Sequence, residues 1–343
     1  VDVAGQQEAG YEIKTQAQGT AGKAFTVEVS GDVRVGDAEQ VVELSKGNVT
    51  YAGVPLTWSN PLFIRRSEQT LAIQCEEGNV GGGAFALKAR KTSEEVQGQV
   101  QLSNIRLDES EKDLFSKFKG KVNADFEIGG SISAPTVDLV VDVDQVGLDE
   151  VDAGGAAHFN GQINAHYTQD LLEGTAKITN DSGDHVHAEW KLPFSLSLQP
   201  FRAEVTGDLE ATASVSAEVA SFAPLFLSPE QRLAGKIAGE VGISGDVKTP
   251  SCRGNISLRD GRYENAVSGT MLKGLEIRCE VKDNTLKITS LQATDGKDGA
   301  LTGSGTVKLG EGRRGEFALQ LEEMDLIQME TATGTIQGRI TVT

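Results

Sequence analysis

Two stretches of this chain repeat one another. Residues 118–137 read FKGKVNADFEIGGSISAPTV, and residues 233–252 read LAGKIAGEVGISGDVKTPSC, at a constant offset of 115 positions. A repeat longer than one hairpin predicts a serial architecture in which each unit packs on its neighbours. The identical pairs are Gly120/Gly235, Lys121/Lys236, Ile128/Ile243, Gly130/Gly245 and Pro135/Pro250, and apolar character is kept at Phe118/Leu233, Val122/Ile237, Phe126/Val241 and Ile132/Val247.

A third copy begins in the closing residues, ATGTIQGRITVT. We align its Gly334, Ile336, Gly338, Ile340 and Val342 with Gly235, Ile237, Gly239, Val241 and Ile243, at an offset of 99. The sequence stops before this copy reaches its later glycine and proline. We therefore expect the segment to belong to a longer protein.

Apolar and polar residues alternate along most of the chain, which is typical of a strand with one apolar and one polar face. Turn dipeptides separate these segments at Asp260-Gly261, Asp283-Asn284, Asp295-Gly296 and Asp298-Gly299. Short strands joined by tight turns predict a mostly antiparallel all-β fold. The alternating segments are 25–29, 71–75, 85–89, 96–102, 137–143, 194–198, 275–281, 286–288 and 317–321.

Two interruptions have helical signals, and each runs directly into a Gly-Lys-(Val/Ile) block. In 107–120, Asp108 and Glu111 form a capping box, Leu114, Phe115 and Phe118 share a face, and Gly120 follows. In 227–235, Ser228 caps, Pro229 takes the first position and Gln231 completes the box. We expect both helices to cover an apolar sheet face.

Composition excludes several functions. The net charge of −18 argues against nucleic-acid binding and against broad contact with anionic membranes. The sequence contains no run of about 18 apolar residues, the length needed to span a bilayer, and the first residues lack the features of a signal peptide.

The cysteines Cys75, Cys252 and Cys279 fit no zinc pattern. If one strand separates the last two, they lie ~9–10 Å apart, too far for a disulfide.

The candidate chemical sites favour structural roles. His185, His187, Glu189 and Lys191 fall on the polar parity of one strand, so we expect a solvent-facing row rather than a metal site. The TDGKDG run at 294–299 lacks the full spacing of a calcium loop and predicts a hairpin turn. Gly81-Gly82-Gly83 lacks the Lys-Ser/Thr of a phosphate loop and predicts a turn or a bulge. No nucleophile motif occurs, so we expect no enzyme activity, cofactor or metal.

The repeated unit G-K-(V/I)-x(5)-I-x-G-x-(I/V)-x-x-P, followed by Gly299, Leu301, Gly303, Ser304, Gly305, Val307 and Leu309, resembles the TamB family of the AsmA-like group. The resemblance implies a long U-shaped β-sheet, or β-taco, with an apolar interior and short capping helices. It implies a bridge across the periplasm of diderm bacteria, anchored in the inner membrane by another segment. It also implies phospholipid transfer to the outer membrane or assembly of outer-membrane β-barrels with a TamA-like partner, without catalytic residues.

The candidate lipid groove consists of the inward apolar positions, which would contact phospholipid acyl chains. The same residues would also fill a closed sandwich core. A surface adhesin or autotransporter passenger and a carbohydrate-active β-solenoid are the rival functions. The expected sections are 1–106 without a clear repeat, 107–226 with repeat one, and 227–343 with repeat two and the start of a third. The groove residues are Val122, Phe126, Ile128, Leu139, Val141, Val143, Ile237, Val241, Ile243, Ile256, Leu258, Leu275, Ile277, Ile288, Leu301, Val307 and Leu309.

Overall fold

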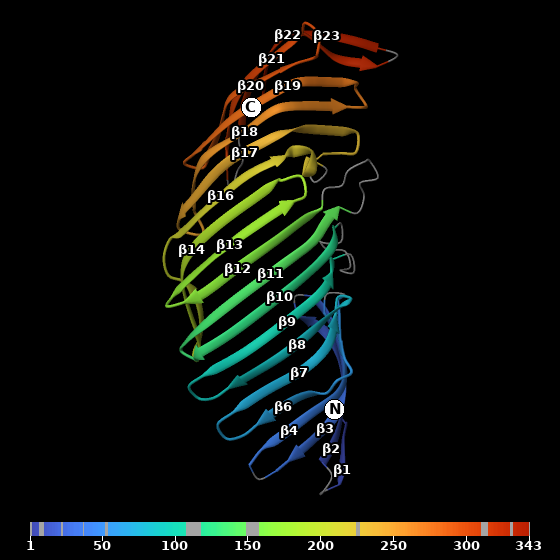
Figure 1. Cartoon of the computed structure of the whole chain (residues 1–343), viewed down its shortest axis with the longest axis vertical. Coiled ribbons are helices and arrows are strands. Elements are labelled where there is room, and N and C mark those ends of the chain that lie inside the picture. The colour runs from blue at the N-terminus through green and yellow to red at the C-terminus, as the bar shows by residue number, and fades with distance from the viewer. Residues whose placement is uncertain are drawn as a thin grey trace. The chain divides into compact units, whose positions relative to one another are not determined.

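The computed structural model describes most of the chain, and nearly all of the described part is β-strand (Figure 1). The strands form a 23-stranded antiparallel sheet, which confirms the predicted all-β class. The described residues are 2–6, 10–21, 23–36, 38–51, 54–107, 118–148, 158–223, 227–309, 315–329 and 332–342.

The chain divides into two compact units. Unit 1 comprises Val1–Gly154, His158–Thr175 and Pro193–Thr206, and unit 2 comprises Gly155–Ala157, Ala176–Leu192 and Gly207–Thr343. Two strands, β13 (Leu171–Asn180) and β14 (His185–Leu198), contribute residues to both. The other strands of unit 1 are β1 (Asp2–Gln6), β2 (Gly10–Ala21), β3 (Lys23–Val35), β4 (Gln40–Tyr51), β5 (Val54–Trp58), β6 (Leu62–Arg66), β7 (Leu71–Val80), β8 (Gly83–Lys91), β9 (Val96–Arg106), β10 (Phe118–Ser131), β11 (Ala134–Leu148), β12 (Phe159–Thr168) and β15 (Phe201–Val205).

After its parts of β13 and β14, unit 2 continues with a strand and the 3-10 turn η3, followed by a meander in which each strand pairs with the next. Its elements are β16 (Leu209–Glu218), η3 (Val219–Ser221), β17 (Gln231–Gly245), β18 (Ser251–Asn265), β19 (Thr270–Lys282), β20 (Thr285–Thr294), β21 (Ala300–Lys308), β22 (Gly315–Met329) and β23 (Ala332–Val342).

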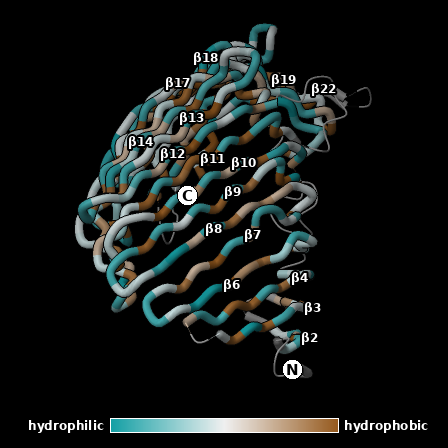
Figure 2. The backbone as a smooth tube through the Cα atoms, turned by 60° about the horizontal axis from the view of Figure 1, so that its bottom comes forward, coloured by the Kyte–Doolittle hydropathy of each residue, from teal (hydrophilic) through white to brown (hydrophobic). Residues whose placement is uncertain are grey.

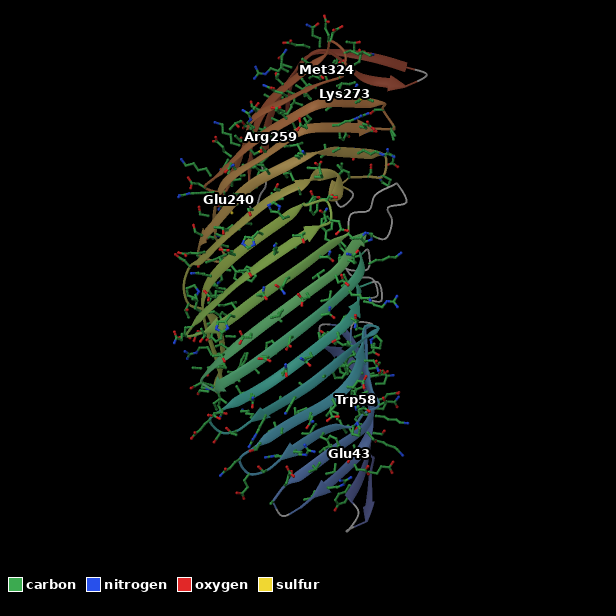
Figure 3. The ribbon with its side chains drawn as sticks, viewed as in Figure 1. Glu43, Trp58, Glu240, Arg259, Lys273 and Met324 are labelled. Atoms are coloured by element: carbon green, nitrogen blue, oxygen red, sulfur yellow. The ribbon has the colours of Figure 1, made fainter. Side chains whose placement is uncertain are left out.

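The core of unit 1 lies under β4, β5, β7 and β8. Trp58, Cys75 and Phe85 are buried there, with Val49, Leu56 and Leu87 among the apolar side chains around them. Trp58, labelled in Figure 3, lies opposite Gly47 and donates its indole N–H to the carbonyl oxygen of Leu44 at 3.0 Å. The missing side chain at Gly47 leaves room for the large ring, so this glycine sets where the core can form.

The strands of unit 2 bend at bulges near their middles. The ladders shift at Gly235 in β17, at Asp260-Gly261 in β18, around Gly274 in β19 and at Glu323 in β22. A bulge adds a residue to one strand and kinks it. Beyond the bend, the hydroxyl of Thr270 in β19 donates to the carbonyl oxygen of Leu326 in β22 at 2.6 Å, although these strands are not ladder neighbours. The sheet of unit 2 therefore curls back on itself at this end.

The curled end of unit 2 encloses its core. The buried residues include Met324, which is labelled in Figure 3. Met324 has no exposed surface, and Leu321 is 2% exposed. The remaining members of this core are Leu258, Leu275, Ala293 and Leu301, and the partly buried residues around them are Val219, Leu233, Tyr263, Leu272, Ile277, Leu291, Leu319 and Leu326.

The repeated glycines have the same backbone conformation in both copies. Gly120 and Gly235 have φ of 141° and 128°, and Gly130 and Gly245 have φ of 90° and 99°. Residues with side chains rarely adopt these angles, which explains why glycine recurs there. The third copy is shifted from our alignment, because Gly338, with φ of 146°, corresponds to Gly235. The offset is 338 − 235 = 103, and Gly338-Arg339-Ile340 then matches Gly235-Lys236-Ile237.

The expectation of a helix over 227–235 is wrong. Residues 229–230 form a turn, and β17 begins at Gln231, where it pairs with Asn265 of β18. The capping contact does form, since the Ser228 N–H donates to the Gln231 side chain at 3.4 Å. Ladder bonds to β18, which a local pattern cannot reveal, outweigh the helical signal.

Most of the first expected helix, including Leu114 and Phe115, lies outside the described residues. Its last residues, from Phe118, begin strand β10.

The turn predictions are mostly confirmed. Gly81-Gly82, Asp283-Asn284 and residues 295–299 each connect two antiparallel strands, with positive φ at Gly81, Gly82, Asp283 and Asn284. The prediction at Asp260-Gly261 is wrong, because both residues lie inside β18. The Asp-Gly pair suits a bulge as well as a turn, since both need a left-handed residue, and Asp260 has φ of 51°.

Candidate functional site

The strand register of unit 1 places the predicted residues of the first repeat on one sheet face. Val122 lies opposite Val143, and Phe126 lies opposite Leu139. Ile128 and Val141 share the parity of these pairs, opposite Val137 and Ala124. The rows continue into the flanking strands as Leu87–Val100–Phe126–Leu139–Ala165 and Phe85–Leu102–Ala124–Val141–Ile163, each across β8–β12.

Unit 2 has an equivalent face across β17–β23. The pairs Ile237–Leu258 and Leu258–Ile277 begin one row, and Ile256–Cys279 and Cys279–Ile288 lie in the next. Figure 2 shows apolar and polar residues alternating along the strands, as expected when each strand presents one apolar face. The full rows are Ile237–Leu258–Ile277–Leu291–Gly303–Leu319–Ile340, Gly239–Ile256–Cys279–Ile288–Gly305–Phe317–Val342 and Val241–Gly254–Val281–Leu286–Val307–Gly315.

Exposure divides the seventeen predicted residues into three groups. Leu258, Leu275 and Leu301 are buried in the unit 2 core, so they hold the fold and offer little surface to a ligand. Leu309 is 41% exposed and follows the end of β21. The remaining thirteen are half-buried: they are Val122, Phe126, Ile128, Leu139, Val141, Val143, Ile237, Val241, Ile243, Ile256, Ile277, Ile288 and Val307.

Within each unit, the half-buried side chains of these rows keep part of their apolar surface in contact with solvent. Contiguous apolar surface of this kind usually marks a binding site.

The opposite face of each sheet is polar. In unit 1, Gln99 donates to Glu127 at 3.0 Å, and Gln162 donates to Asp142 at 2.9 Å, across neighbouring strands. In unit 2, Glu240 and Arg259 (Figure 3) belong to the exposed parity of β17 and β18. These ladders separate a hydrated face from the apolar one along the same strands.

The histidines lie where the alternation predicts. His185 and His187 share the outer parity of β14, and His187 contacts Glu189 at 3.0 Å. His166 contacts Asp138 at 2.6 Å across β11 and β12. In the described part of the chain, no three His, Cys, Asp or Glu residues gather as metal ligands would.

The three cysteines are free thiols. Cys252 and Cys279 lie on the adjacent strands β18 and β19, so no strand separates them. Cys279 pairs with Ile256, four residues along β18 from Cys252, which separates the thiols by roughly 13 Å along the strand. Burial raises the pKa of the Cys279 thiol, and burial also raises the pKa of Cys75, so neither is an activated nucleophile.

Sequence reasoning missed part of the apolar face. Leu87, Val100 and Leu102 carry the same alternation as the predicted residues and extend the unit 1 face into β8 and β9. Met324 was missed for a different reason. The bulge at Glu323 reverses the parity of β22, so alternation counted through it assigns Met324 to the wrong face.

No helix in the described residues is both long and apolar enough to cross a membrane. The chain matches no protein-family model, and no curated protein or solved structure shows significant similarity to it.

Proposed function

We propose that this chain binds phospholipid acyl chains along the apolar faces of its two sheet units. The observation that carries the proposal is the register, which joins half-buried apolar residues of successive strands into rows backed by a mostly polar outer face. Acyl chains need apolar area and no specific polar partner. A row of branched aliphatic side chains supplies such area without fixing a head group.

The dimensions of the rows suit this ligand. Neighbouring strands lie ~4.8 Å apart, so a row across the seven strands β17–β23 extends over six steps, roughly 29 Å. A bilayer core of ~30 Å holds two acyl chains end to end, so such a row exceeds the length of one chain. Each methylene buried on the face contributes about 0.8 kcal/mol.

The biological setting that we propose follows from the TamB-like repeat. The chain would form part of a bridge-like periplasmic protein of a diderm bacterium, anchored in the inner membrane by a segment outside this sequence. It would carry phospholipid toward the outer membrane, assist the assembly of outer-membrane β-barrels with a TamA-like partner, or do both. Catalysis has no part in this proposal, and the charge of −18 fits transport without broad adsorption to anionic bilayers.

Site-specific photocrosslinking tests the proposal with matched positions on single strands. A photoreactive p-benzoylphenylalanine replaces inward Ile288 or outward Lys287 in β20, and inward Val141 or outward Asp142 in β11. After expression in a diderm host and irradiation, we expect phospholipid adducts at Ile288 and Val141 by mass spectrometry. Lys287 and Asp142 report background.

Equal labelling at both faces, or no lipid at either, would exclude the acyl-binding role. That outcome favours the alternative of an adhesin or autotransporter-like structural protein, in which the polar outer face would make the functional contacts.

A further inference from the structure

Strand β15 of unit 1 has an unpaired edge in the middle of the chain. All five of its residues are exposed, and Phe201 and Val205 are exposed to 76% and 47%. On one side the strand pairs with β14, where Phe194 faces Val205 and Leu198 faces Phe201. The described ladders place no strand on its other side, so that edge of β15 is open to solvent.

The strands that follow β15 in the chain pair elsewhere. The first half of β14 pairs with β16, from His185 opposite Ser216 to Lys191 opposite Glu210. The other side of β16 pairs with β17. After β17 the chain turns directly into β18. The open edge is therefore a property of β15 itself and of the strands around it.

A second interrupted strand in unit 1 shows what such an edge looks like when it is covered. Strand β4 pairs with both β5 and β6, as β14 pairs with both β15 and β16. Beyond them, β7 pairs with both β5 and β6. Leu56 of β5 is accordingly half-buried and Trp58 is buried. Strand β15 lacks the neighbour that β7 provides there.

The backbone of β15 presents free hydrogen-bonding groups along this edge. The N–H of Thr206 donates across the ladder to the carbonyl oxygen of Pro193 at 2.9 Å. Successive residues of an antiparallel strand direct their backbone groups alternately to its two sides. Because Thr206 points toward β14, the groups of Phe201, Ala203 and Val205 point to the open edge. Free groups in such a row favour the addition of another strand.

The sequence of β15, FRAEV, is complementary to itself when two copies run antiparallel. With Ala203 at the centre, Phe201 lies opposite Val205 of the other copy, and Arg202 lies opposite Glu204. Neither Arg202 nor Glu204 has an ion-pair partner among the described residues. Opposite charges that face each other across a ladder stabilise it, and the apolar pair would cover two exposed side chains.

We propose that two copies of this chain associate through β15, which pairs antiparallel with itself about a two-fold axis at Ala203. Each outward residue then exchanges both backbone hydrogen bonds with the residue opposite. The contact is isologous, so each copy satisfies the other and no further copy adds to it. A single short strand makes a small interface, so the dimer forms reversibly. The inference does not depend on lipid binding.

Charge reversal tests the register by both loss and recovery of binding. Arg202→Glu and Glu204→Arg each place like charges opposite one another, so each variant alone should dimerise about 10- to 100-fold more weakly than the parent chain. A mixture of the two variants should form a heterodimer, because the charges are again complementary. Sedimentation velocity of the purified chains, over roughly 1 to 300 µM, measures each association.

The double variant Arg202→Glu/Glu204→Arg is the matched control. It carries both substitutions but restores opposite charges across the two-fold axis, so it should dimerise about as well as the parent chain. Recovery in this variant separates pairing across the axis from any effect of the single substitutions on folding.

Disulfide trapping tests the position of the axis independently. Ala203→Cys should crosslink to its own copy, since residues opposite each other in such a ladder have Cα atoms ~5.5 Å apart. Val205→Cys should crosslink poorly, because the two copies of position 205 lie four residues apart along the strands, roughly 13 Å. The parent chain controls for the three native thiols.

Four results would overturn the inference. They are a monomer throughout the concentration range, a dimer that neither single charge reversal weakens, no heterodimer in the mixture, and equal crosslinking of the Ala203→Cys and Val205→Cys variants. None of them bears on acyl binding, which photocrosslinking measures at other positions.

Discussion

At the scale of single residues, large aromatic rings recur opposite glycines. Phe25 faces Gly19, Trp58 faces Gly47, Phe85 faces Gly78 and Phe317 faces Gly305. Each ring lies over the backbone of the neighbouring strand, where a side chain at the glycine would collide with it. Two of these rings, Trp58 and Phe85, are buried in the core of unit 1. The glycines thus make room for rings in a chain with only 5% aromatic residues.

We therefore expect Gly47→Ala to destabilise unit 1 by about 1–3 kcal/mol, because the new methyl group overlaps the Trp58 ring. Urea unfolding followed by Trp58 fluorescence in a Trp190→Phe background measures the loss. Gly129→Ala is the matched control, since its methyl group would meet Thr136 Oγ1 at an ordinary 3.7 Å. Equal destabilisation by both variants would contradict the role of ring packing.

Asp295 organises the turn between β20 and β21. This residue is 4% exposed, and its carboxylate accepts backbone N–H bonds from Lys297 at 2.8 Å, Gly299 at 3.1 Å and Asp325 at 3.0 Å. These bonds, led by the one from Asp325, hold the pKa of Asp295 below its usual value against the opposing effect of burial.

Asp295→Asn should cost about 1–3 kcal/mol of unfolding free energy at pH 7, because an amide accepts fewer of these bonds. A depressed pKa gives stability that is fully present above the unfolded pKa and lost as pH falls through the folded value. The gap between variant and parent should therefore narrow below about pH 4. Asp298→Asn, exposed in the same turn, should leave the pH profile unchanged.

At the scale of elements, side chains from neighbouring strands stabilise the bulges. The N–H of Asn104, whose φ is 56°, donates to the Asn123 side chain at 2.8 Å. The N–H of Gln145 donates in the same way to Asn160 at 3.0 Å. An asparagine opposite a bulge thus satisfies a donor that the interrupted ladder leaves unpaired.

Asn160→Ala should lower stability by about 0.5–1.5 kcal/mol and speed hydrogen exchange at the Gln145 amide. Asn164→Ala is the control on the same strand, because Asn164 donates only to the Gln162 side chain among the bonds described for it. Unchanged exchange at Gln145 in the Asn160 variant would rule out this bulge-stabilising role.

Local patterns predicted the strands well and the bends poorly. The alternation of apolar and polar residues identified β7, β8, β9, β11 and β19, because one face of each strand is exposed to solvent. It could not assign Asp260-Gly261, since the same dipeptide makes a turn or a bulge according to what pairs around it. The third copy was misaligned by four residues because Gly334 and Gly338 match the repeated glycine equally well in sequence. Only the positive φ of Gly338 distinguishes them.

At the scale of the whole molecule, each strand has an apolar and a polar face, so the same substitution can be compared on both faces in a functional test. Ile243, Ile256 and Ile277 lie on the apolar face of unit 2, and Ser257, Glu276 and Arg278 lie on the other parity of the same strands. The alternating pattern predicted most residues of the half-exposed apolar rows. It could not predict the closed core around Met324, because that core depends on how far the sheet of unit 2 curls.

Replacing Ile243, Ile256 or Ile277 with Asp should abolish complementation of outer-membrane integrity in a strain lacking the full protein. A charge on the apolar face costs several kcal/mol to desolvate and would interrupt the acyl path that we propose. Asp at Ser257, Glu276 or Arg278 should be tolerated. Expression and circular dichroism confirm folding first. Folded variants that tolerate charge on both faces would defeat the transport proposal.

The order of strand pairing has a consequence for how such a chain is made. Every pairing described joins strands no more than two apart along the sequence. Loop-closure entropy is therefore small at each step, and contact order stays low for an all-β protein. A chain emerging from the ribosome can pair each new strand with one already made, without waiting for distant segments. Gene duplication could lengthen it by whole hairpins in the same way.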